Sequence, residues 1–180
     1  MALSAAVLIA GAQTEKGNVI IGAQLANISA DLRSGANSFR LALSPRAGWF
    51  VQDDLALGAK VDLDATFQKG NDPVSWGLVP FARYYFPGAG IEVVNKTRIF
   101  AEAGAGVGGV GTGGQTTTGF RGFGGVGAAY FVNANVALET SANVGIVAGS
   151  GNTTVNPNLN LGFQIHLPSK KLKEMRGDVK

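Results

Sequence analysis

Charged side chains recur at every second position in the middle of this 180-residue chain, as in Lys60, Asp62 and Asp64. This spacing puts them on one face of an extended strand. An interior lined by such faces must pair its charges, because a buried ion without a partner is strongly unfavourable. The predicted lumen charge network comprises Arg40, Arg46, Lys60, Asp62, Asp64, Arg83, Arg98, Glu102, Arg121, Glu139 and His166.

Antiparallel pairing of such strands predicts particular contacts within this network. They are Arg40 with Asp62 or Asp64, Asp62 with Arg83, and Glu139 with His166. We expect the network to act as a plug that holds the fold in shape. A gated ion path through the same side chains is the alternative.

Catalytic chemistry is not indicated by the residues available. The only histidine is His166, no cysteine is present, and no Ser-His pair falls where an exposed rim is expected, so a base with a nucleophile is missing. No catalytic residue, metal site or cofactor is predicted. Loop residues that could bind a cation or a sugar are Asp31, Asp72, Thr116, Thr117 and Thr118, although solvated loop side chains are far more common.

Two glycine patterns match the dinucleotide-binding spacing G-x-G-x-x-G, beginning at Gly106 and at Gly122. Neither opens a helix, so the dipole and free amides that would hold a pyrophosphate are absent. We interpret them as strand glycines that permit tight curvature. The tripeptide Arg-Gly-Asp at 176–178 is attributed to chance.

Eight segments with period-two alternation account for most of the chain, separated by clusters of Gly, Asn, Asp, Ser and Pro. They are residues 18–26, 38–50, 55–67, 76–86, 97–107, 120–131, 135–147 and 158–167. Tight turns are expected at 52–54 and 133–134. Longer polar loops are expected at 29–37, 68–75, 108–119 and 148–157.

Strand length and charge placement decide which face meets the surroundings. Segments of about ten residues match a tilted crossing of a bilayer, whereas strands of soluble sandwiches average about five or six. Within a segment, the charged residues are all at odd or all at even positions and so share one face, as expected if the other face touches lipid. The pattern predicts an all-β fold, an eight-stranded antiparallel up-and-down transmembrane β-barrel, with the tight turns on the periplasmic side.

Aromatic residues gather at the two ends of these segments, which is typical of membrane-interface belts. The predicted interface aromatics are Trp49, Phe50, Tyr84, Phe86 and Tyr130 at one end, and Phe39, Phe67, Trp76 and Phe120 at the other.

The chain divides into three parts. Residues 1–12 are predicted to be a signal peptide, shortened at its front because no Lys or Arg precedes the apolar run. Residues 13–167 form the barrel, and residues 168–180 a basic periplasmic tail. Much of the positive charge lies in that tail, so the net charge of +3 does not indicate a nucleic-acid partner.

The segments GWFVQDDLALGAKVDL (48–63), PFARYYF (80–86) and AAYFVNANVALE (128–139) resemble those of small eight-stranded outer-membrane β-barrels of the OmpA/OmpX type. The resemblance implies the bacterial outer membrane of a Gram-negative envelope, with membrane lipid, lipopolysaccharide and the barrel-assembly machinery as partners. It also implies an assembly signal in the last strand, formed by Asn160, Gly162, Ile165 and Leu167.

Three functions remain open at this point. The first is a monomeric barrel with a structural or surface-interaction role, whose lumen is closed by the charged network and whose loops meet an unidentified extracellular ligand. The second is a narrow, low-conductance porin-like channel for small solutes. The third is a soluble lipocalin-like carrier, which requires the charged faces to point outward into water.

Overall fold

The computed structural model describes residues 13–33, 36–68, 73–87, 96–112, 115–149 and 152–169. The predicted signal peptide and tail residues 170–180 lie outside the described residues. Eight strands follow one another along the chain. They are β1 (Val19–Arg33), β2 (Ala36–Gln52), β3 (Leu55–Gln68), β4 (Val74–Tyr85), β5 (Thr97–Thr112), β6 (Gln115–Phe131), β7 (Val136–Gly149) and β8 (Asn152–Leu167).

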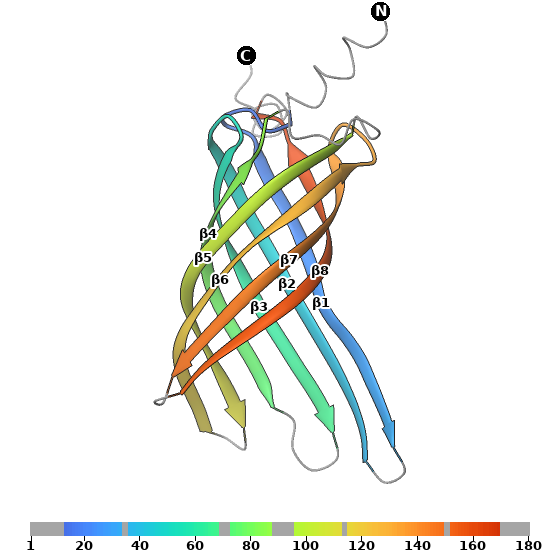
Figure 1. Ribbon diagram of the computed structural model, residues 1–180, viewed down its shortest axis with the longest axis vertical. Coiled ribbons are helices and arrows are strands. Elements are labelled where there is room, and N and C mark those ends of the chain that lie inside the picture. Colours follow the sequence, from blue (N-terminus) through green and yellow to red (C-terminus); the bar gives the residue numbers. More distant parts are fainter. Residues whose placement is uncertain are drawn as a thin grey trace, which may run out of the picture.

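Each strand pairs antiparallel with the next, and β1 pairs with β8, so the sheet closes into a barrel. The predicted eight-stranded antiparallel up-and-down barrel is therefore confirmed. Because the strand number is even, the start of β1 and the end of β8 lie at the same end of the barrel, at the top of Figure 1. We call this the turn end, and the opposite end, where β1 and β2 meet, the hairpin end.

The turns at the turn end are short between β2 and β3 and between β6 and β7. Asp54 closes the first with a φ of 62°, a left-handed conformation that Asp tolerates better than most residues. Asn133 closes the second, since its side-chain oxygen accepts hydrogen bonds of 2.8 Å from the backbone N–H groups of Asn135 and Val136.

The hairpin end differs from the sequence prediction. Segments expected as long polar loops are largely strand, because β5 runs to Thr112, β6 starts at Gln115 and β8 starts at Asn152. Pairing continues to Thr112↔Gln115 and Gly149↔Asn152. Polar strands can thus leave the apolar zone and still satisfy their backbone groups with each other.

The outside of the barrel is apolar. Leu159 is 76% exposed, Leu161 67% and Val126 57%. Outward exposure of this kind is unfavourable in water and suits contact with lipid. Among the described residues, no helix is long and apolar enough to cross a membrane.

Inside, glycines make room for rings on neighbouring strands. Phe100 on β5 lies opposite Gly127 on β6, where an added Cβ would come within 2.5 Å of the ring. Phe81 on β4 lies opposite Gly58 on β3, where the same distance would be 2.7 Å. The many strand glycines therefore let large side chains fill a narrow lumen.

Candidate functional site

A layer of four buried charges crosses the lumen. Glu102 Oε2 lies 2.6 Å from Arg46 Nη1 and 2.6 Å from Arg83 Nε, so two arginines share one carboxylate oxygen. Arg83 Nη1 lies 2.6 Å from Glu139 Oε1. All four side chains are at most 3% exposed. The two arginines balance the two glutamates, which makes this buried layer electrically neutral.

Further contacts join this layer to the walls of the barrel. Arg46 Nη2 donates to Gln24 Oε1 at 2.6 Å, and Arg83 Nη1 donates to the Tyr85 hydroxyl at 3.0 Å. The Arg83 guanidinium lies 4.0 Å from the centre of the Phe100 ring. Such charge-assisted and cation–π contacts restrict the arginine to one position.

An aromatic cluster fills the lumen on the turn-end side of the charge layer. Phe50, Tyr85 and Phe131 surround His166, with ring centroids 6.0, 6.1 and 5.0 Å from the imidazole. His166 Nδ1 is hydrogen-bonded to the carbonyl oxygen of Gln13 at 3.1 Å. The side chains of the charge layer and of the cluster are buried together in this half of the barrel.

Two sequence predictions are wrong at this end. Phe50 was expected in an interface belt, yet it is 1% exposed and belongs to the interior cluster, because its neighbour Trp49 takes the outward position. Glu139 meets Arg83 and not His166, whose ring is held among aromatics.

Asp62 likewise meets Lys60 rather than Arg83. Register explains the difference, since Asp62 lies opposite Gly77, and Arg83 lies opposite Ala56, much nearer the turn end.

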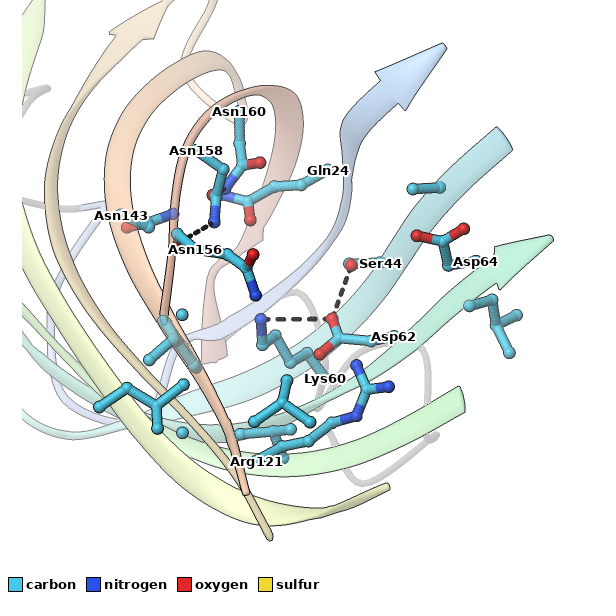
Figure 2. A pocket seen from close by; sticks show the side chains of 18 of the residues that line it. Gln24, Ser44, Lys60, Asp62, Asp64, Arg121, Asn143, Asn156, Asn158 and Asn160 are labelled. Carbon is cyan, nitrogen blue, oxygen red and sulfur yellow. Dashed lines mark hydrogen bonds and ion pairs between the residues drawn. The ribbon is translucent and has the colours of Figure 1, made fainter. Parts of the chain in front are cut away.

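The half of the lumen toward the hairpin end holds a polar cavity of about 390 Å³. Figure 2 shows two walls with different chemistry. One carries the charged residues Lys60, Asp62, Asp64 and Arg121, and the other carries the amides of Gln24, Asn143, Asn156, Asn158 and Asn160.

Two residues of the charged wall form an ion pair. Lys60 Nζ lies 3.2 Å from Asp62 Oδ1, which also accepts a hydrogen bond of 2.7 Å from the Ser44 hydroxyl. Arg121 Nη2 donates to the Ser75 hydroxyl. Lys60 also lies 3.9 Å from the centre of the Phe123 ring. The cavity is lined by two cationic and two anionic residues, so it carries no net charge.

The remaining predicted residues lie apart from this cavity. Arg98 Nη1 pairs with Asp54 Oδ1 at 2.9 Å at the turn end, where Asp54 Oδ1 also accepts from the Thr14 hydroxyl at 2.5 Å. The side chains of Arg40, Phe39 and Asp31 and the whole of Asp72 lie outside the described residues. Thr116, Thr117 and Thr118 are exposed strand residues of β6.

The other predicted interface aromatics whose side chains are described point outward. Trp49, Tyr84, Phe86 and Tyr130 are exposed toward the turn end, and Phe67, Trp76 and Phe120 toward the hairpin end. Of the predicted assembly residues, Asn160 is buried in the lumen, and Gly162, Ile165 and Leu167 are half-buried in the paired part of β8.

The uncharged amides of the cavity were absent from the predicted lumen network, and Asn160 was predicted only as part of the assembly signal. Their signal was present in the sequence, because Asn156, Asn158 and Asn160 share the parity of His166 on β8, and Asn143 shares that of Glu139 on β7. Parity therefore identifies the lumen face whether or not a residue is charged.

No family model matches the chain, and no curated protein matches it. Among solved structures, the crystal structure of Neisserial surface protein A aligns with a TM-score of 0.59 and 18% identity, covering 82% of this chain and 95% of that one. The N-terminal β-barrel domain of Pseudomonas aeruginosa OprF aligns with a TM-score of 0.50 and 18% identity, covering 84% and 98%. The fold is that of small outer-membrane barrels of the OmpA/OmpX type and supports the predicted location in the bacterial outer membrane.

Proposed function

We propose that this chain is a non-enzymatic outer-membrane barrel that is closed to solutes at its turn end and interacts with partners at its hairpin end. The turn end faces the periplasm and the hairpin end the cell surface. Membrane lipid and lipopolysaccharide surround the barrel, and the barrel-assembly machinery inserts it. The similarity to a Neisserial surface protein is one of fold alone. The proposal is therefore argued from the closed interior of this chain, which leaves the ends of the barrel as the parts that can meet partners.

The observation that carries the proposal is the neutral charge layer of Arg46, Glu102, Arg83 and Glu139 backed by the aromatic cluster. An eight-stranded barrel is just wide enough for side chains to fill. Separating these ion pairs to let a solute pass would leave buried charges without partners, which is strongly unfavourable and keeps the layer closed.

The alternatives fit the structure less well. A porin-like channel needs a continuous polar path, and the cluster around His166 interrupts it with apolar rings. A soluble carrier needs a polar exterior, whereas Leu159 and Leu161 are among many exposed apolar residues on the outside.

Single-channel recording in planar bilayers tests the closed lumen. We expect no conductance steps from the wild-type chain. The variant Arg83→Ala, Glu102→Ala, Tyr85→Ala, Phe131→Ala removes one cation and one anion from the charge layer and two rings from the cluster, and it should give steps. The variant Tyr84→Ala, Tyr130→Ala, which removes outward rings, should not. Heat-modifiable migration on gels checks that each variant is folded. Stable steps from the wild type would overturn the closed-lumen proposal.

A further inference from the structure

The contact between β1 and β8 covers only part of each strand. Pairing starts at Val19↔Leu167 and ends at Leu25↔Leu161. Beyond that point β1 continues to Arg33 paired with β2, and β8 continues back to Asn152 paired with β7. In Figure 1 the two strands diverge here, β8 toward the lower left and β1 toward the lower right. The barrel therefore has a seam between β1 and β8 in its hairpin half.

This seam lies at the level of the membrane. Phe120, an exposed aromatic residue of the hairpin-end belt, pairs with Ala148, which pairs with Thr153 on β8. Val155 and Leu159 come after Thr153 on the way to the turn end, and they are 58% and 76% exposed. The unpaired stretch of β8 is thus apolar on its outer face and borders hydrocarbon.

Unpaired backbone is tolerated at membrane depth only where it lines a protein-enclosed or water-filled space. The residues of this stretch meet that condition, because Asn156, Pro157 and Asn158 line the polar cavity. Pro157 also has no N–H to pair, and proline within sheets is confined to edges, strand starts and bulges. The seam therefore lies between the polar cavity and lipid, and no backbone pairing of β1 with β8 crosses it.

The cavity offers hydrogen bonds of both kinds and no net charge. Asn160 is 7% exposed, and its Oδ1 has no hydrogen-bond partner among the described residues. The buried Nε of Arg121 likewise has no hydrogen-bond partner among them. One is an acceptor and the other a donor. Hydroxyl groups both donate and accept, so they match this pair and the surrounding amides better than a phosphate or an ammonium would.

We propose that the cavity binds the uncharged sugar head group of a membrane amphiphile, which enters sideways through the seam while its alkyl tail stays in lipid. The cavity volume of about 390 Å³ is at the small end of ligand sites and suits a single-ring head group. The inference rests on the proposed function only in requiring that the barrel lie in a membrane.

The test uses the full chain in phosphatidylcholine nanodiscs and a decyl glucoside that carries a diazirine on its first tail carbons. After illumination, mass spectrometry maps the labelled peptides. We expect labelling concentrated on residues 152–161 of β8. A decyl phosphocholine with the same diazirine should label this stretch at least fivefold less.

Matched glycine variants supply the control. Gly145 lines the cavity, and a Cβ there would meet only ordinary contacts of 3.6 Å with Asn156 O and 3.8 Å with Asn158 Nδ2. Gly145→Phe should fill the cavity and reduce β8 labelling at least fivefold. Gly124, where a Cβ would meet nothing within 4 Å, serves as the control, and Gly124→Phe should leave the labelling unchanged.

Three results would overturn the proposal: labelling spread evenly over the outer face, equal labelling by both probes, or labelling indifferent to Gly145→Phe. Bilayer conductance is a separate measurement, so channel activity in the wild type would refute the closed lumen without deciding this result.

Discussion

At the scale of residues, Glu102 is the centre of the interior. Its Oε2 accepts from both Arg46 and Arg83. Arg83 has a second carboxylate in Glu139, whereas Arg46 has only Gln24 as a further polar partner. Neutralising Glu102 therefore leaves Arg46 without a carboxylate, whereas neutralising Glu139 leaves both arginines in contact with Glu102.

Glu102→Gln is expected to lower the free energy of unfolding by about 3–5 kcal/mol, because two buried arginines lose their shared carboxylate. Glu139→Gln should cost less, since Arg83 keeps Glu102. Asp53→Asn, at an exposed turn position, serves as the control and should change stability by about 0.5 kcal/mol or less. Urea unfolding in lipid vesicles, followed by tryptophan fluorescence, measures all three. Equal effects of Glu102→Gln and Asp53→Asn would contradict the assignment.

At the scale of elements, neighbouring strands fit together through pairs of a glycine and a ring. Phe100 of β5 occupies the space that a side chain at Gly127 of β6 would need. Because both positions face the lumen, the pair sets how closely the charge layer and the aromatic cluster can pack. The same strand also carries Gly124, which faces open space on the outside.

Gly127→Val is expected to destabilise the barrel by about 1–3 kcal/mol through overpacking, because a Cβ there would lie 2.5 Å from the Phe100 ring and 2.6 Å from the carbonyl oxygen of Thr140. The double variant Gly127→Val, Phe100→Ala should recover part of that loss, since the ring that clashes is gone. Gly124→Val is the matched control and should leave stability close to wild type. Unfolding midpoints in the same vesicles report the differences. Failure of Phe100→Ala to relieve Gly127→Val would show that the backbone, and not the ring, is the obstacle.

At the scale of the whole molecule, the barrel is polarised along its axis. The turn end is packed with rings and ion pairs, and the hairpin end holds the polar cavity. Both the first and the last described residues belong to the turn end (Figure 1). The proposed surface role requires that the hairpin end face the exterior of the cell.

Orientation can be read directly because the chain has no cysteine of its own. A membrane-impermeant maleimide applied to intact cells should label Asn152→Cys, at the exposed start of β8. Asp53→Cys, in the turn between β2 and β3, should react only after the outer membrane is permeabilised. Labelling of Asp53→Cys alone on intact cells would reverse the proposed orientation.

The sequence by itself determined the strand number, the antiparallel order and which positions share a face, because period-two alternation is a local property of an extended chain. Lys60 and Asp62 illustrate this, since their parity alone puts them on one side. Parity also separates Trp49 from Phe50, although the clustering of aromatics at strand ends suggested a shared belt.

Only the tertiary structure decided which interior residues meet. Arg83 pairs with Glu102 on the next strand and with Glu139 three strands away. Whether Arg83 can reach Glu139 depends on the register of every strand pair between them in the closed barrel. The seam beyond Leu25 and Leu161 has the same origin, because the last strand meets the first only where the accumulated stagger brings them together. Local pattern carries no information about that stagger, so the cavity and its opening emerge only from the closed fold.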